Sequence, residues 1–242
     1  MQSNKHHRQH GYTLVEISAV VVIVGLIIGG IMSGSALHRN AQLKAVMDQE
    51  SQLIEATLKF QSIYHGLPGD LWNATTVFGA TAPDGNPINN GNGNGLWDVP
   101  DVSYVAQHLF LAGLLNGSYN GIVAGGNNSV GNIIIGSLPH SEFSTGTIPP
   151  LNYFEFDGAQ DFNNDGFLTS NMESLLAVLT PAETLKIDMK YDDGIPNTGN
   201  IYGQNGQNVV GANTCVTNAG TVYNLSNTNI ACVVLFMVSN KF

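Results

Sequence analysis

The feature that most constrains this chain is an apolar segment close to its N-terminus. The 24 residues from Leu14 to Leu37 contain a single ionisable side chain, Glu16. At 1.5 Å rise per residue, a helix of this length crosses a hydrocarbon layer of about 30 Å. The residues before it are polar and include Lys5 and Arg8, which places them on the cytoplasmic side by the positive-inside rule. We therefore predict one membrane-spanning helix with a cytoplasmic N-terminus.

The helical pattern continues beyond the apolar segment. No Gly or Pro occurs between Leu37 and Tyr64, and apolar residues there recur at spacings of three and four. The next residues include Gly66, which favours a C-cap, and Pro68, which cannot continue a helix. The sequence thus predicts one helix over residues 12–64, apolar all round in its first half and amphipathic in its second.

Glu16 requires an explanation, because a carboxylate in a membrane helix costs about 2.5 to 3.5 kcal/mol on insertion scales. One interpretation places it at headgroup depth, and another gives it a counter-charge. The order Gly11-Tyr12-Thr13-Leu14-Val15-Glu16, after a short basic leader and before an apolar helix, resembles the class III signal of type IV pilins and type II secretion pseudopilins.

The resemblance implies a specific maturation and assembly route. A prepilin peptidase would cut after Gly11 and methylate the new N-terminus, Tyr12. Glu16 would pair with the free amine of an adjacent subunit, since a buried charge without its partner is strongly destabilising. Tyr12 stands where Phe is commoner, and the helix lacks the proline that many major pilins carry.

The same resemblance implies where the protein resides and what it meets. Its location would be the bacterial inner membrane, with a periplasmic head, and then a periplasmic or extracellular filament. Its partners would be the prepilin peptidase, other copies or related pilins or pseudopilins in a helical filament, and an inner-membrane assembly platform.

Residues 66–242 are expected to form the head. Apolar residues at helical spacing predict a helix over about 102–115, with Asp101 available as its N-cap. Short apolar runs between Gly and Pro turns, such as 133–135 and 153–156, predict strands. Two further helix starts are predicted by capping boxes that pair Ser170 with Glu173 and Thr180 with Glu183.

These elements define an α+β fold, in which the long helix packs on a small antiparallel sheet with short extra helices. We divide the chain into a leader, 1–11, a transmembrane and assembly half of the long helix, 12–36, an amphipathic half, 37–65, and the head, 66–242.

The two cysteines of the chain, Cys215 and Cys232, lie 17 positions apart. In a periplasmic head they are expected to form a disulfide, and two buried thiols are the alternative. The β-branched residues from Ile230 to Val238 predict a strand. We predict that this strand pairs with the stretch around Cys215.

One segment resembles the first nine positions of an EF-hand calcium loop, with oxygen-bearing side chains at alternate positions and a Gly at the sharp turn. Its candidate ligands are Asp161, Asn163, Asp165 and Thr169, but Met172 occupies the position of the closing acid. An Asx turn before a helix is the competing interpretation. Calcium is the one cofactor that the sequence suggests.

Two other acidic regions are weaker calcium candidates. The Asn and Gly residues of 90–95 indicate turns first, and a calcium site there would need more carboxylates than Asp98 and Asp101 alone. The second region contains Asp188, Asp192 and Asp193, for which capping of turns is the alternative.

The charge balance and the motifs exclude other functions. The chain has 8 Lys and Arg against 18 Asp and Glu, so it lacks the cation clusters that nucleic acids need. Metal-protease spacing, nucleophile elbows and phosphate-binding loops are absent from the sequence, and His65, His108 and His140 are predicted to be surface or helix-end residues. We therefore expect a filament subunit and not an enzyme. The alternative is a signal-anchored periplasmic or cell-surface binding module, such as a calcium-dependent adhesin, that does not polymerise.

Overall fold

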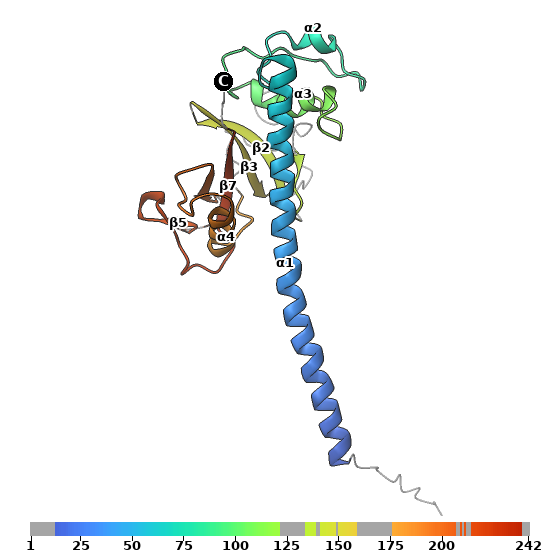
Figure 1. Cartoon of the computed structure of the whole chain (residues 1–242), viewed down its shortest axis with the longest axis vertical. Coiled ribbons are helices and arrows are strands. Elements are labelled where there is room, and N and C mark those ends of the chain that lie inside the picture. The colour runs from blue at the N-terminus through green and yellow to red at the C-terminus, as the bar shows by residue number, and fades with distance from the viewer. Residues whose placement is uncertain are drawn as a thin grey trace, which may run out of the picture. The chain divides into compact units, whose positions relative to one another are not determined.

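The computed structural model has an α+β fold, as the sequence predicts (Figure 1). It describes residues 13–121, 134–138, 141–148, 150–158, 176–206, 209, 211 and 214–238. The chain divides into two compact units, Met1–Gln42 and Leu43–Phe242. The long helix contributes its first part to one unit and the remainder to the other.

The long helix α1 spans Leu14–Tyr64, 51 residues, which confirms the predicted helix. Its side chains from Leu14 to Ile31 are all exposed. Within the part of the chain that the structure describes, α1 is the one helix long and apolar enough to cross a membrane, with a mean hydropathy of 2.6 in its most apolar window. At the other end, His65 and not Gly66 takes the left-handed conformation that ends the helix, with φ of 56°.

A five-stranded antiparallel sheet forms the centre of the second unit, and its strand order is β1-β2-β3-β7-β4. These strands are β1 (Ile134–Ile135), β2 (Ser141–Ile148), β3 (Leu151–Gly158), β4 (Ile201–Asn205) and β7 (Cys232–Val238). All seven residues of β7 are buried. This strand comes last in the sequence yet lies between β3 and β4.

The second half of α1 and one face of the sheet share a hydrophobic core. Buried residues of α1 recur at helical spacing, as predicted, although Leu58 is 38% exposed. The aromatic side chains of the sheet meet in this core, where Phe143 lies 4.9 Å from Phe156 between ring centroids. The members contributed by α1 and the sheet include Leu43, Val46, Met47, Leu53, Ala56, Phe60, Phe143, Phe154, Phe156, Val234, Phe236 and Val238.

Short helices and a small second sheet complete the head. The helices are α2 (Ala74–Phe78), the 3-10 turn η1 (Asp101–Ser103), α3 (Val105–Leu111), α4 (Pro181–Tyr191) and the 3-10 turn η3 (Asn218–Gly220). The second sheet pairs β5 (Val216–Thr217) with β6 (Val222–Tyr223). Thr180 and Glu183 form the predicted capping box of α4, whereas the box predicted at 170–173 lies outside the described residues.

The prediction that Asp101 caps a helix is wrong. The helix predicted over 102–115 is present as η1 followed by α3, but Asp101 lies inside η1 and the N-cap residue there is Pro100. The Asp101 carboxylate instead turns toward the preceding loop, where its Oδ2 accepts a long hydrogen bond of 3.4 Å from the Asn92 N–H.

Cys215 and Cys232 form the expected disulfide. However, the predicted pairing of the last strand with the Cys215 stretch is wrong. β7 pairs with β3 and β4, while the stretch after Cys215 enters the separate β5-β6 sheet. The disulfide thus joins two sheets, because its geometry requires close Cα atoms, here 4.9 Å apart, and not ladder partners.

Candidate functional site

Glu16 lies in the first turn of α1 and forms a capping box with Thr13. The Thr13 N–H and hydroxyl donate to Glu16 Oε2 at 2.7 and 2.9 Å, and the Glu16 N–H donates to Thr13 Oγ1 at 3.3 Å. The carboxylate therefore satisfies backbone donors that a helix start leaves unpaired. Gly11 and Tyr12, the predicted processing residues, lie outside the described residues.

This capping box is a contact that the sequence interpretation missed. The signal was present, because Thr13 and Glu16 have the spacing of a Thr-x-x-Glu box before an apolar run. Both bonds that the Glu16 carboxylate accepts from Thr13 end on Oε2. In the part of the chain that the structure describes, Oε1 accepts none, so a second partner can reach the same carboxylate.

The segment after α1 is held by a buried histidine. The His108 Nδ1 accepts a hydrogen bond of 2.8 Å from the Gly69 N–H, and its Nε2 lies 3.1 Å from the Asn89 carbonyl oxygen. The ring is 0% exposed, and this burial lowers the pKa of His108 to about 4. A neutral ring with its proton on Nε2 fits both contacts. The sequence predicts surface or helix-end positions for three histidines. His65 is exposed and follows the end of α1, as predicted, whereas His108 lies in the last turn of α3 but is buried and not on the surface. His140 lies outside the described residues.

Asp70 organises the Asn- and Gly-rich loop that the sequence identified first as turns. Its carboxylate accepts hydrogen bonds from three successive backbone N–H groups, those of Gly93, Asn94 and Gly95, at 2.6, 3.0 and 2.7 Å. The loop also passes close to the chain at Asp70, since a Cβ on Gly91 would lie 2.3 Å from the Asp70 Cα. Residues 90–95 therefore wrap around one buried carboxylate.

Two more carboxylates meet the same loop. Asp98 accepts from the side-chain amides of Asn92 and Asn94 at 3.0 and 2.8 Å. Asp101 is 1% exposed, and burial together with repulsion from Asp70 and Asp98 raises its pKa to about 7. The structure thus adds Asp70 to the pair that the sequence had singled out. The sequence did not indicate that Asp70 binds this loop, because Asp70 lies far from residues 90–95 along the chain.

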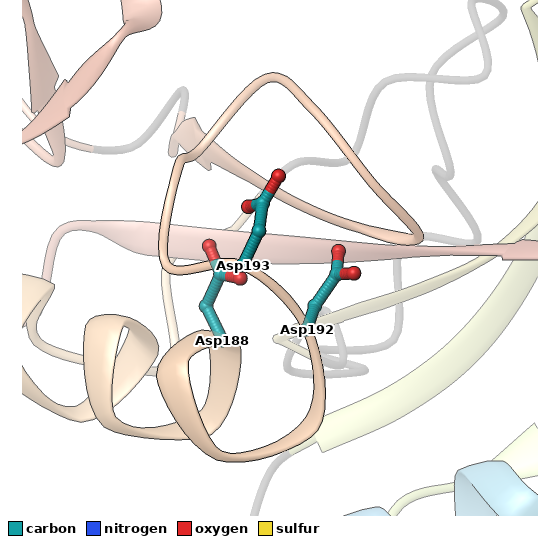
Figure 2. Close-up of side chains that lie close together, drawn as sticks. All are labelled: Asp188, Asp192 and Asp193. Atoms are coloured by element: carbon teal, nitrogen blue, oxygen red, sulfur yellow. The ribbon is translucent and has the colours of Figure 1, made fainter.

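The second acidic group is assembled as the sequence suggested. Asp188, Asp192 and Asp193 place ligand atoms within 4.8 Å of one another, at the C-terminal end of α4 (Figure 2). Burial raises the pKa of Asp188, with added repulsion from its two neighbours. The hydrogen bond from the Thr198 hydroxyl lowers the pKa of Asp193.

The oxygens of this group already serve the turn between α4 and β4. Asp188 accepts from the Gly194 N–H at 2.9 Å and from the Tyr223 hydroxyl at 2.7 Å. The other two acids bind the same turn: Asp192 accepts from the Ile201 N–H at 2.8 Å, and Asp193 from the Ile195 N–H at 2.8 Å. These contacts fit the turn-capping interpretation, and calcium at this group stays a prediction. The EF-hand-like residues Asp161, Asn163, Asp165 and Thr169 lie outside the described residues.

Comparison with known proteins identifies the N-terminal segment. Residues 6–32 match the family described as the prokaryotic N-terminal methylation motif, a range that includes Gly11, Tyr12 and Glu16. The chain therefore carries a type IV pilin-like prepilin signal. This motif implies processing by a prepilin peptidase and pilin-like assembly in general, and together with the apolar half of α1 it fits membrane anchoring. No curated protein and no solved structure matches the chain significantly.

Proposed function

We propose that this protein is a structural subunit, a pilin or pseudopilin, of a type IV pilus or a type II secretion filament. The precursor is cut after Gly11, Tyr12 becomes the methylated N-terminus, and the subunit polymerises through α1. The observation that carries this proposal is the methylation motif at residues 6–32, which runs into a 51-residue helix with Glu16 in its first turn.

In the proposed assembly contact, the two oxygens of the Glu16 carboxylate have different partners. In the single chain, Oε2 is held by Thr13, which fixes the carboxylate at the helix start. Oε1 then receives the Tyr12 amine of a neighbouring subunit, and the two charges neutralise each other in an apolar environment. One unpaired charge in such an environment is strongly destabilising, so this contact sets the register between subunits.

The apolar half of α1 supports an inner-membrane anchor before assembly and an apolar filament core after it. Its exposed side chains include Leu14, Val21 and Leu26, which are 86%, 65% and 72% exposed. With the leader in the cytoplasm, the head lies in the periplasm, where the Cys215–Cys232 disulfide is chemically stable. The role of such a subunit is structural and not enzymatic.

The cleavage step is tested by intact mass spectrometry of the chain made in membranes with and without an active prepilin peptidase. We expect loss of residues 1–11 and one added methyl group on Tyr12. Gly11→Val should block cleavage, because the peptidase site would have to accept a branched side chain beside the scissile bond. Gly34→Ala is the matched control, since a Cβ at Gly34 meets nothing within 4 Å. An uncut chain, or a cut after Ala36, would contradict the proposal.

The assembly step is tested by comparing Glu16→Ala with Thr13→Ala. Removing the Thr13 hydroxyl costs about 1 kcal/mol of helix capping but leaves the carboxylate, so filaments should still form. Glu16→Ala and the uncharged Glu16→Gln should insert into the membrane and fail to assemble. The measurement is the amount of subunit in sheared filaments relative to membranes. Normal filaments with Glu16→Ala would refute the pairing, and absence of filaments from the wild type would favour the anchored binding module.

A further inference from the structure

The chain contains six Asn-Gly pairs, and all of them lie in the part of the head that the structure describes. They begin at Asn90, Asn92, Asn94, Asn116, Asn120 and Asn205. An asparagine before a glycine is prone to an internal reaction, in which the glycine nitrogen attacks the asparagine side-chain amide. Glycine permits this attack because it has no side chain beside the nitrogen and its backbone rotates freely. The contacts of each pair therefore decide whether it can react.

In the loop around Asp70, the nitrogens that would attack are all hydrogen-bonded. The Gly93 and Gly95 N–H groups donate to the Asp70 carboxylate at 2.6 and 2.7 Å. The Gly91 N–H donates to the Leu71 carbonyl oxygen at 3.0 Å. Each of these bonds has to break before its nitrogen can turn toward the preceding side chain, which raises the barrier to the reaction.

The side-chain amides of the same loop are held as well. Asn92 and Asn94 donate to the Asp98 carboxylate at 3.0 and 2.8 Å. Their Oδ1 atoms accept backbone N–H groups at 2.9 and 2.8 Å, so each of these amides is fixed at both ends. The Asn90 Oδ1 accepts from the Thr75 N–H at 2.8 Å. Asp98 therefore fixes two of the three amides.

Two further pairs are held by other parts of the head. The Asn205 Oδ1 accepts from the Cys215 N–H at 2.7 Å, and the Gly206 N–H donates to a carbonyl oxygen at 2.8 Å. Gly121, the second residue of the pair that begins at position 120, is buried against the Gln107 side chain, which leaves no room for a Cβ there. Neither pair can close a ring without disturbing these contacts.

The pair Asn116-Gly117 differs from the other five. Both of its residues are exposed. Among the residues that the structure describes, neither the Asn116 side chain nor the Gly117 N–H makes a hydrogen bond. The side-chain amide can therefore rotate toward the Gly117 nitrogen without breaking a contact, and water reaches both groups.

The Tyr119 hydroxyl activates the Gly117 nitrogen. It donates at 3.2 Å to the main-chain carbonyl oxygen of Asn116, which belongs to the same peptide group as the Gly117 N–H. When this N–H loses its proton, the negative charge is shared with that oxygen, and a hydrogen-bond donor there stabilises it. Burial raises the pKa of Tyr119, so its hydroxyl remains a donor. Only glycine fits beneath the Tyr119 ring, because a Cβ on Gly117 would lie 2.7 Å from it.

We propose that Asn116 is a self-modification site, at which the Gly117 nitrogen attacks the Asn116 Cγ. A bond forms between these atoms, and the Asn116 side-chain nitrogen leaves as ammonia together with the proton that Gly117 loses. Water then opens the succinimide ring at either of its carbonyl groups, which yields aspartate or isoaspartate. The product adds one negative charge to a chain whose net charge is already -10. The surface charge of the head thus changes as the molecule ages.

The experiment incubates the purified full chain in detergent at mildly alkaline pH. Samples are digested under acidic conditions, which suppress the reaction, and the six pairs are followed by peptide mass spectrometry. We expect Asn116 to convert to a mixture of aspartate and isoaspartate. The other five pairs are internal controls and should react roughly tenfold more slowly or less, since their hydrogen bonds have to break first.

Two variants test the roles that the contacts imply. Tyr119→Phe keeps the ring but removes the hydroxyl, and it should slow conversion of Asn116 roughly fivefold, the value of one hydrogen bond. Asp98→Ala frees the amides of Asn92 and Asn94, which should then react while Asn116 keeps its rate. An intact Asn205 shows in each case that the head is still folded.

The chain unfolded in urea is the matched control for sequence alone. There the six pairs should react at similar rates, and Tyr119→Phe should have no effect. An Asn116 that stays intact in the folded chain would overturn the proposal, and so would conversion of Asn92 or Asn94 at the same rate as Asn116. Equal rates in folded wild type and folded Tyr119→Phe would refute activation by the hydroxyl.

Discussion

Protonation of His108 should destabilise the head, because the hydrogen bonds of the folded structure fit only the neutral imidazole ring. Its Nδ1 accepts from the Gly69 N–H at 2.8 Å, so a proton on Nδ1 would face another donor. The pKa of His108 falls from 6.5 to about 4 on folding. At about 1.4 kcal/mol per pKa unit, this difference amounts to about 3 kcal/mol. Because the folded-state pKa is lowered, this stability is present above pH 6.5 and is lost as the pH falls toward 4.

The assay is denaturant unfolding of the full chain in detergent, followed by tryptophan fluorescence. Trp97 is a suitable reporter, since it is fully buried and its Nε1 donates to the Pro68 carbonyl at 2.7 Å, next to the histidine contact. We compare the wild type with His108→Gln, which keeps a side-chain acceptor for Gly69 but cannot be protonated. Their difference in unfolding free energy should shrink by about 3 kcal/mol between pH 7 and pH 4.

The variant comparison is necessary because other buried groups act in the opposite direction. Burial raises the pKa of Glu50 to about 7, and Asp101 titrates near the same value, so both favour the folded state as the pH falls. The contributions of Glu50 and Asp101 are present in both the wild type and His108→Gln, so they cancel in the difference between the two unfolding free energies. His38→Gln, at an exposed site, should keep the wild-type pH profile. A constant difference between wild type and His108→Gln across this range would refute the reasoning.

Two further predictions concern stability. Replacing both Cys215 and Cys232 by Ala opens a loop of 17 positions and should cost about 3 kcal/mol, or roughly 6 to 12 °C in melting temperature by calorimetry; a loss below about 1 kcal/mol would contradict the chain-entropy account. Glu50→Gln should stabilise the head by up to about 3 kcal/mol at pH 8, because burial penalises the charged Glu50 carboxylate and so raises its pKa to about 7. Near pH 4.5 the Glu50 carboxyl group of the folded protein is already protonated, so the substitution should have no effect. Equal effects of Glu50→Gln at the two pH values in urea unfolding would show that burial of the charge is not the cause.

The sequence predicted those parts of the fold that depend on local pattern. The helix over 12–64 follows from a long apolar period without breakers, and the observed α1 has nearly the same bounds. The capping box of α4 and the strand near the C-terminus follow from equally local signals. The candidate processing residues also came from one short segment, which the methylation motif covers.

Long-range arrangements could not be predicted in this way. Asp70 and Gly93 are 23 positions apart, yet the Gly93 N–H donates a hydrogen bond to the Asp70 carboxylate. The residues around each of them give no indication of this contact. His108 looked like a surface residue because its partners at Gly69 and Asn89 belong to other turns. The partner of β7 was misassigned, because a disulfide shows that two residues are near but not which strands share a ladder.

The position of β7 has a consequence for how the head is made. β3 and β4 each complete their pairing only when residues 232–238 insert between them. Until that late segment is in place, both strands present open hydrogen-bonding edges, which are prone to pair with other chains. If the head is exported as we propose, a partly exported molecule would keep both edges open, and only a fully translocated chain would close its sheet. The order of the strands would then couple folding to export.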